Sequence, residues 1–294
     1  MCEEKIRLEY LDTISGIFIL FMVIHHWQGE FEILRPVYEI LLPILYFFMS
    51  WFFYKSGRVF NLNRGFHVIV LNSTKRLLLP FVFYSFIGYL IWGISLLIAG
   101  ELHKNFFYSW ISELFWTGSL LGNGPLWYLL SLFVIRILYS SINKKKSLVY
   151  VFVGISAIIS FIMYGVRLNI PYWCYNVPLG SVFFGLGILR SNVVIDKKIE
   201  LKIAILTISI FIASMFFCPS IVSVFGNSLC KGNYYIWFIS SISGIFIFEF
   251  FCKRFITSSF FSWIGRNSMT ILVCHMPVLY VFSFVKIFIA TLIG

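Results

Sequence analysis

Long apolar stretches are the feature that most restricts the fold of this chain. Residues 77–99 and 148–164 contain no Asp, Glu, Lys or Arg. A helix crosses the roughly 30 Å hydrocarbon core of a bilayer in about 20 residues, which is the length of these stretches. Since 60% of the 294 residues are hydrophobic and only 12% are charged, no soluble fold of this size could bury so much apolar surface. The sequence therefore predicts an integral membrane protein.

Apolar runs bounded by polar or turn residues predict about nine or ten membrane-spanning helices. The predicted fold class is all-α, a polytopic transmembrane helical bundle formed by a single domain over residues 1–294. The first run lacks the small-residue cleavage pattern of a removable signal peptide, so we treat it as a retained span. The predicted spans are residues 11–28, 36–54, 77–99, 125–142, 148–164, 172–189, 199–217, 233–252 and 269–293. The stretch from Gly100 to Pro125, which is polar at its ends, is interpreted as a lumenal or re-entrant segment.

Basic residues are distributed unevenly between the predicted loops. With a cytoplasmic N-terminus, 17 of the 23 Lys and Arg residues fall on the cytoplasmic side and four on the opposite side, an imbalance typical of membrane proteins in this orientation. These residues lie in several short loops and form no patch with interleaved aromatic residues, so the net charge of +11 does not indicate nucleic acid binding. The six cysteines include no CxxC pair and are interpreted as packing residues. We expect no metal ion.

Ionisable side chains inside the predicted spans are candidates for function, because each costs at least about 2.5 kcal/mol near the bilayer centre. In the first span, Asp12, Ser15 and His26 are separated by 3 and 11 residues and share one face of a helix. His25 lies about a quarter turn away, so the spacing favours His26 as the histidine that faces the bundle. The alternative is that one of the two histidines simply bonds to a carbonyl group of a neighbouring helix.

Four further spans carry ionisable residues, and for two of these residues, Glu39 and Glu249, the sequence indicates no partner. In the last span Ser268, His275 and Lys286 are separated by 7 and 11 residues and again share a helical face, although Pro277 can kink the helix. Lys286 could instead extend its aliphatic stem to the outer surface. Arg136 suits a phosphate or carboxylate ligand that reaches up from the cytoplasm, while an interaction with the inner headgroups explains it equally well.

Four motifs between residues 10 and 277 carry a resemblance to a known family. The first motif is YLDTISGIFILFMVIHHW, which is similar to the family's Leu-Asp-x-x-basic-Gly-Ile run that ends in histidine. The second is STKRLLLP, which is similar to the family's basic segment before the third span, and the third is GPLWYLLSLF, which is similar to its Leu-Trp-Phe-Leu motif. The fourth is IGRNSMTILVCH, which is similar to the family's C-terminal motif. The matching positions are Leu11, Asp12, Gly16, His26, Arg76, Pro80, Leu126, Trp127, Leu129, Gly265, Asn267, Ser268 and His275. The chain thus resembles the acyltransferase-3 family, in particular its fucose 4-O-acetylase-like and exopolysaccharide-modifying branch.

Two positions depart from the family pattern. Ser15 stands where the family has a basic residue, and Trp51 stands where the family has a glycine near the end of the second span. In the family, the basic residue lies near the helix face of the histidine and is expected to help hold the acyl donor. Its replacement by serine therefore removes a charge that the resemblance implies would help to hold the acyl donor.

The resemblance implies a membrane O-acyltransferase of the bacterial inner (plasma) membrane. It would move an acetyl group from cytoplasmic acetyl-CoA to a hydroxyl group of a cell-surface carbohydrate, such as an exopolysaccharide, capsule, O-antigen or lipid-linked glycan. His26 is the expected general base, since an unperturbed pKa of about 6.5 suits proton transfer near neutral pH. Lys75, Arg76 and Arg136 are the candidate contacts to the phosphates of acetyl-CoA. Residues expected to support the substrate or the structure are Asp12, Ser15, Trp127, Ser268 and His275.

Two alternatives remain open at this point. A transporter or flippase for a lipid-linked glycan also uses intramembrane His, Lys and Arg, but it predicts inverted repeats or broken helices at matching positions, and the sequence contains no evident repeat. The second alternative is a family member that transfers succinyl or another acyl group, or one that has lost catalysis, with Ser15 marking the change.

Overall fold

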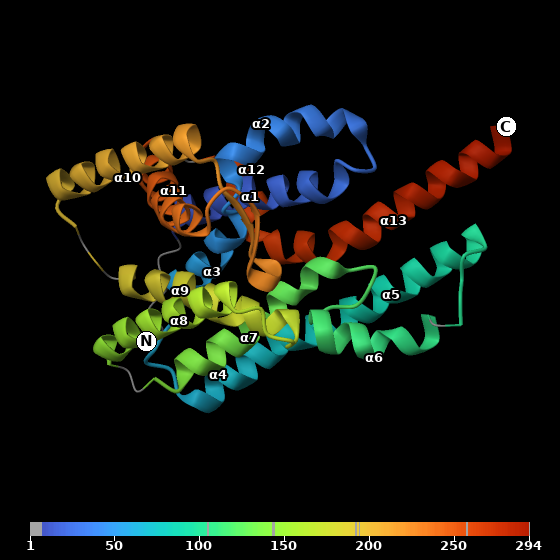
Figure 1. The fold of residues 1–294 in the computed structure, drawn as a ribbon, viewed down its shortest axis with the longest axis horizontal. Helices are drawn as coiled ribbons and strands as arrows, with labels where there is room; N and C mark the ends of the chain where they lie inside the picture. The colour runs from blue at the N-terminus through green and yellow to red at the C-terminus, as the bar shows by residue number, and fades with distance from the viewer. Residues whose placement is uncertain are drawn as a thin grey trace. The chain divides into compact units, whose positions relative to one another are not determined.

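The structure, a computed structural model, describes residues 8–104, 106–142, 145–191, 193, 195–256 and 258–293. Three of the basic residues assigned to the cytoplasm lie outside this range, namely Lys5, Arg7 and Lys144. The described chain is helical apart from one short strand pair (Figure 1), which confirms the all-α fold class. The elements are α1 (Glu9–Trp27), η1 (Glu32–Leu34), α2 (Arg35–Leu45), α3 (Phe48–Arg58), α4 (Phe66–Ser73), η2 (Thr74–Leu78), α5 (Leu79–Ala99), α6 (Phe106–Thr117), η3 (Gly124–Leu126), α7 (Trp127–Ser140), α8 (Lys146–Gly165), α9 (Tyr172–Arg190), α10 (Lys197–Phe217), β1 (Ile221–Ser223), η4 (Phe225–Asn227), β2 (Ser228–Lys231), α11 (Tyr234–Arg254), α12 (Ser259–Arg266) and α13 (Ser268–Ile293).

Seven of the described helices are long and apolar enough to cross a membrane, and the bent pair α2–α3 is an eighth candidate. The apolar helix α7 is shorter, so each predicted span corresponds to a helix or helix pair of the structure. Two spans differ in form. The span predicted at 77–99 belongs to a longer helix, Phe66–Ile98, because the π-helical turn η2 joins α4 to α5. The span predicted at 36–54 is bent by 53°, and Pro43, which cannot donate a backbone hydrogen bond, lies just before the break.

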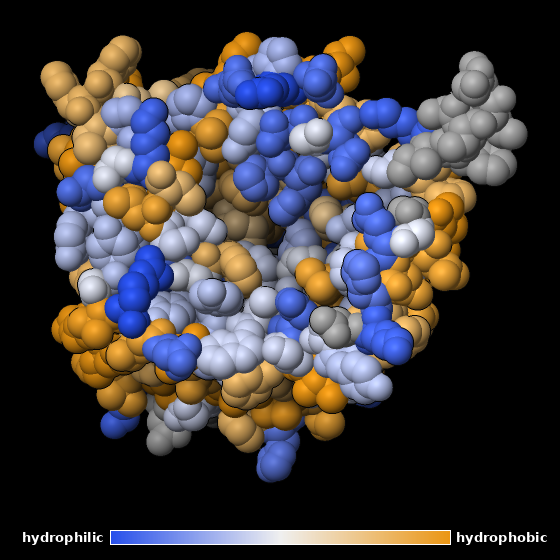
Figure 2. Space-filling model, turned by 45° about the vertical axis from the view of Figure 1, so that its right-hand side comes forward, coloured by the Kyte–Doolittle hydropathy of each residue, from blue (hydrophilic) through white to orange (hydrophobic). Residues whose placement is uncertain are grey.

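The middle of helix α8 carries two serines inward and isoleucine side chains outward. Ser156 and Ser160 are buried, whereas Ile155, Ile158 and Ile162 are exposed. This arrangement is the reverse of a helix in a soluble protein and is typical of a helix that faces lipid, where serine packs between helices. Hydrophobic side chains also cover wide areas of the surface in view in Figure 2. The burial pattern thus agrees with the integral membrane protein predicted from the sequence.

The chain forms two compact units. Unit 1 consists of residues 1–55, 193–222 and 229–271, and unit 2 consists of residues 56–192, 223–228 and 272–294. In unit 1, α1 packs on α2, α11 and α12, and α10 packs on α11. In unit 2, α9 packs on α6, α7, α8 and η4, and α4 packs on α7.

The closest helix crossing of unit 1 joins α1 and α12 at two glycines. A Cβ atom on Gly16 would lie 2.0 Å from the carbonyl oxygen of Phe261, and one on Gly265 would lie 1.8 Å from that of Asp12. Small residues at a crossing let two backbones approach closely, as in other membrane helix pairs. Gly16 belongs to the first sequence motif and Gly265 to the fourth, so this crossing places these two motifs in contact.

We predict that Gly16→Ala lowers the free energy of unfolding by about 1–3 kcal/mol, because the added methyl group overlaps the backbone of α12. Gly154 of α8 is the matched control, since nothing lies within 4 Å of its Cβ position. Gly154→Ala should leave stability unchanged or raise it by up to about 1 kcal/mol. Denaturant titration of the purified proteins in mixed micelles measures both changes. Equal stabilities of the two variants would contradict the close crossing.

Candidate functional site

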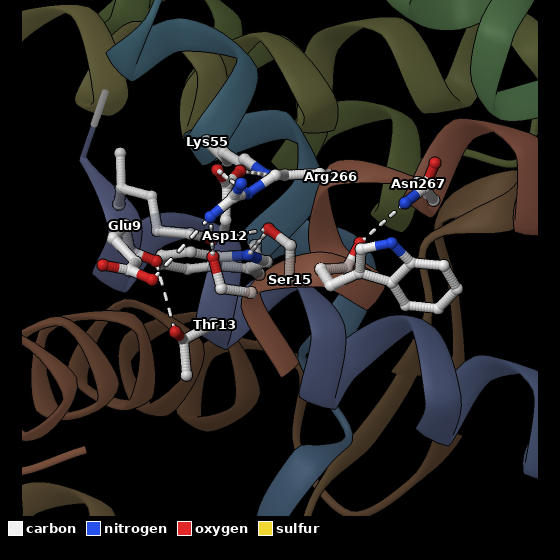
Figure 3. A network of polar contacts seen from close by, with 11 residues as sticks. Glu9, Asp12, Thr13, Ser15, Lys55, Arg266 and Asn267 are labelled. Carbon is white, nitrogen blue, oxygen red and sulfur yellow. Dashed lines mark hydrogen bonds and ion pairs between the residues drawn. The ribbon is translucent and has the colours of Figure 1, made fainter. Parts of the chain in front are cut away.

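An ion cluster lies beside the α1–α12 crossing in unit 1 (Figure 3). Lys55 donates a hydrogen bond to Asp12 with an Nζ–Oδ1 distance of 3.0 Å, and the Asp12 side chain is only 7% exposed. The Arg266 guanidinium lies 3.7 Å from a Glu9 carboxylate oxygen and 4.0 Å from Asp12 Oδ2. Two cations therefore face Asp12. A buried carboxylate needs such partners, so these contacts stabilise the packing of unit 1, while the role of Asp12 in the site stays a prediction.

The two departures from the family pattern are in direct contact. Trp51 Nε1 donates a hydrogen bond to Ser15 Oγ at 3.1 Å, and Ser15 Oγ donates to the carbonyl oxygen of Leu11 at 2.8 Å. Both side chains are fully buried. A long basic side chain at position 15 would have to displace the indole ring, so serine at one position and tryptophan at the other form a matched pair.

The two histidines of α1 differ in their surroundings. His25 Nδ1 lies 3.1 Å from the hydroxyl oxygen of Tyr38 on α2, and the Tyr38 ring stacks on Phe21 at 5.9 Å. The His25 and His26 rings lie 5.0 Å apart, and both side chains are partly exposed. Tyr38 therefore orients His25 against α2. The assignment of His26 as general base stays a prediction.

In unit 2, His275 belongs to a buried junction between α13 and the turn before α7. Its Nδ1 donates to the carbonyl oxygen of Leu272 at 2.9 Å, and the side chain is 4% exposed. With the proton on Nδ1, the Nε2 atom of the neutral ring is an acceptor. Asn123 is fully buried and donates to the carbonyl oxygens of Val273 at 2.9 Å and Tyr84 at 3.3 Å. The turn thus ties α5 to α13.

The start of α13 follows directly on the end of α12. Asn267 Nδ2 donates to the carbonyl oxygen of Trp263 at 2.9 Å and so satisfies a carbonyl at the end of α12. Ser268 opens α13 and is partly buried, while Lys286 near the other end is exposed. The exposure of Lys286 favours the interpretation in which it extends to the surface.

Three arginines form a positive cluster in unit 2. The charge of Arg136 on α7 interacts with those of Arg76 and Arg64, and its guanidinium carbon lies 5.6 Å from the ring centre of Phe60. The Arg136 Nε atom is buried and has no hydrogen-bond partner in the described part of the chain. No described Asp or Glu forms an ion pair with any of the three arginines. Guanidinium groups without carboxylate partners are suited to bind phosphate.

The basic pair Lys75 and Arg76 lies in the π-helical turn η2. Single π-turns inside α-helices frequently occur at functional sites. Both side chains are exposed, and the charge of Arg76 acts on Arg136 because α7 packs on η2. The structure thus brings together two of the three predicted phosphate contacts and adds Arg64.

Trp127 is packed inside unit 2. Its side chain is 8% exposed, and its ring lies 5.6 Å from the ring of Phe225, which lies 5.9 Å from that of Tyr172. A membrane anchor would expose its indole at an interface. The burial of Trp127 therefore argues against an interfacial anchor, and its supporting role stays a prediction.

Two other carboxylates assigned to spans have clear partners. Glu249 on α11 is buried and accepts hydrogen bonds from the hydroxyl groups of Tyr54 at 2.8 Å and Tyr10 at 3.2 Å. Glu39 on α2 is exposed and pairs with Arg35 at 3.2 Å. Glu249 therefore joins α1, α3 and α11, whereas Glu39 lies on the surface.

Four residues of these clusters were not singled out from the sequence, namely Lys55, Arg266, Tyr38 and Arg64. The two cations beside Asp12 had one available signal, because an acidic residue inside a span needs a positive partner. Tyr38 and Arg64 gave no such signal. The residues that contact Tyr38 and Arg64 are brought together by helix packing. The spacing of residues along one helix does not predict which distant segment packs against it.

Comparison with known proteins was made against family models, curated proteins and solved structures. The acyltransferase-3 family model, described as an acyltransferase domain, matches residues 8–292 and so covers both units. No curated protein and no solved structure matches the chain.

We predict that Lys55→Met lowers the free energy of unfolding by about 3 kcal/mol, because it removes a cation that lies 3.0 Å from the buried Asp12 carboxylate. The control is Arg35→Met, which breaks the exposed pair with Glu39 and should cost at most about 1 kcal/mol. Adding Asp12→Asn to Lys55→Met should recover part of the loss. A Lys55→Met protein as stable as Arg35→Met would show that the buried pair does not form.

Proposed function

The chain belongs to the acyltransferase-3 family, and from this membership we propose that it transfers an acetyl group from acetyl-CoA to a hydroxyl group of a carbohydrate. The proposal includes the fucose 4-O-acetylase-like and exopolysaccharide-modifying branch, in the bacterial inner membrane. The family match favours an acyltransferase over the transporter or flippase considered from the sequence. Acetyl rather than succinyl transfer rests on the resemblance of the four motifs.

The proposed reaction needs one base. His26 takes the proton of the acceptor hydroxyl group while the hydroxyl oxygen attacks the thioester carbonyl carbon. The carbon–sulfur bond then breaks, and CoA leaves as a thiolate that receives the proton from the imidazolium. A positioned base of this kind contributes about 10²–10⁴-fold to the rate. The choice of His26 over His25 rests on its position on the polar face of the first span and on its match to the family motif.

The observation that carries the proposal is the arginine cluster of unit 2. Acetyl-CoA carries phosphate groups, and Arg136, Arg76 and Arg64 offer guanidinium groups without described carboxylate partners. Arg136 lies one turn before the end of α7 at Ser140, on the side that the distribution of basic residues predicts to be cytoplasmic. Acetyl-CoA is a cytoplasmic compound, so the donor would approach from that side. Lys75, exposed in the same π-turn, is proposed as an outer contact.

We predict that His26→Ala lowers kcat by about 10²–10⁴-fold, because the hydroxyl group loses its base. His25→Ala is the control and should retain most of the activity. Release of free CoA thiol from acetyl-CoA, with de-O-acetylated cell-envelope glycan as acceptor, measures turnover. Acetyl-CoA binding by both variants checks that the protein is folded. Equal turnover in the parent and in His26→Ala would contradict the assigned base.

We predict that Arg136→Met raises the Kd for acetyl-CoA by roughly tenfold or more, since a hydrogen bond to a charged group contributes about 1.5–3 kcal/mol. Lys104→Met is the control, because it removes one positive charge from an exposed position of the same unit. S-acetylpantetheine, which lacks the nucleotide phosphates, should react equally well with the parent and with Arg136→Met. An equal loss with both donors would place Arg136 outside the phosphate site.

A further inference from the structure

A cavity of about 460 Å³ opens in unit 2 and is separate from the arginine cluster. Its lining includes Trp116 at the end of α6, Arg167 and Asn169 in the loop between α8 and α9, and Tyr172 and Tyr175 in the first turn of α9. The mechanism proposed above uses none of these residues.

The floor of the cavity is held by Arg167. Its guanidinium donates to the carbonyl oxygens of Gly226 at 2.9 Å and Asn227 at 3.1 Å. The guanidinium carbon also lies 5.8 Å from the ring of Tyr164 and 5.7 Å from that of Tyr175. Two of its five N–H groups thus fix the turn η4, and the group keeps further donors for a ligand. No described carboxylate pairs with Arg167.

The turn η4 is fixed from its other sides as well. Gly226 has a φ of +70°, a left-handed conformation that favours glycine, and its N–H donates to Asn176 Oδ1 at 2.6 Å. Asn227 Nδ2 donates to the carbonyl oxygen of Ser160 on α8 at 2.9 Å. Asn176, Asn227 and Ser160 are fully buried. The turn that holds the guanidinium of Arg167 is therefore fixed before any ligand binds, which lowers the entropic cost of binding.

The side chains that face the opening combine flat apolar surfaces with hydrogen-bonding groups. Tyr172 is 52% exposed and Trp116 is 37% exposed, and the amide of Asn169 and the guanidinium of Arg167 lie beside them. A sugar ring has an apolar face of C–H groups and a rim of hydroxyl groups. Aromatic rings stack on the apolar C–H face, and amide and guanidinium groups form hydrogen bonds with the hydroxyl groups.

The cavity lies at the end of α8 and α9 that the charge distribution predicts to be non-cytoplasmic, the side from which a cell-surface carbohydrate would approach. The loop between α8 and α9 is at the opposite end of these helices from Lys146 and Arg190, which the charge distribution predicts to be cytoplasmic. Tyr172 also contacts Phe225, which contacts Trp127, the buried tryptophan of the third motif. The cavity is thus joined by aromatic packing to a residue that matches the family.

We infer that this cavity is a subsite for a sugar ring of the acceptor glycan, with Tyr172 and Trp116 stacking on the ring and Asn169 and Arg167 bonding to its hydroxyl or acidic groups. The inference rests on the proposed function, since it assigns the acceptor of the same reaction. Tyr172→Ala and Trp116→Ala should each raise the KM for de-O-acetylated cell-envelope glycan by roughly tenfold, the loss expected for one aromatic contact. Their kcat and their KM for acetyl-CoA should not change.

Two variants separate stacking from damage to the fold. Tyr172→Phe keeps the ring face and should keep the KM of the parent. Tyr108→Ala removes an exposed tyrosine of α6 that does not line the cavity and should also keep it. A KM for glycan that rises in Tyr172→Ala and Trp116→Ala, but not in these two controls, would support the subsite. If the parent transfers acetyl groups and the KM is unchanged in both alanine variants, the subsite is wrong and the proposed function stands.

A parent protein without transferase activity would overturn the proposed function, and the cavity is then tested by binding alone. The same glycan, added without acetyl-CoA, should quench the tryptophan fluorescence of the parent, and Trp116→Phe should remove most of that change. Quenching that depends on Trp116 supports a saccharide site. Its absence, or its persistence in Trp116→Phe, overturns the inference.

Discussion

The close crossing of α1 and α12 is the constraint on which unit 1 depends. Two glycines let the backbones meet, and because they do, Arg266 at the end of α12 lies beside Asp12 and Glu9 at the start of α1. Lys55 completes the charge balance from α3. An ion cluster that is partly screened from water needs matched charges, so the crossing and the cluster stabilise each other. α1, which carries both histidines, is thereby fixed at its first half.

Charges are arranged differently in the two units, and the difference bears on function. In unit 1 the buried carboxylates Asp12 and Glu249 have a cation and tyrosine hydroxyl groups, respectively, as partners. The guanidinium groups of Arg136, Arg76 and Arg64 in unit 2 have no described carboxylate partners. Paired charges serve the fold, whereas a cluster of one sign is unfavourable until an anion joins it. This contrast is why the arginine cluster, and not the larger number of basic residues elsewhere, supports the proposed donor site.

The contact between Ser15 and Trp51 changes how the departures from the family pattern are interpreted. Considered one at a time, serine in place of a basic residue suggests a lost donor contact, and tryptophan in place of glycine suggests a crowded helix. In the structure the indole N–H bonds to the serine hydroxyl group, and both side chains are fully buried. Each replacement accommodates the other. The positive charge near this face of α1 comes instead from Lys55 and Arg266, which both approach Asp12. A matched pair of this kind is compatible with an active enzyme.

The fold class, the positions of the spans and the family could be predicted from the sequence, because they follow from the length of apolar runs and from motifs local in the chain. The sequence also singled out Arg136, whose charge inside an apolar segment calls for an explanation, and Asp12 and Arg76, which lie in motifs that resemble the family. Helix packing in three dimensions was needed to show that Lys55 and Arg266 pair with Asp12, that Arg64 joins the arginine cluster and that Tyr38 orients His25. It alone gathered Trp116, Arg167 and Tyr172 around one cavity. Spacing along a helix predicts which side chains share a face, whereas the partner opposite that face depends on which distant helix packs there.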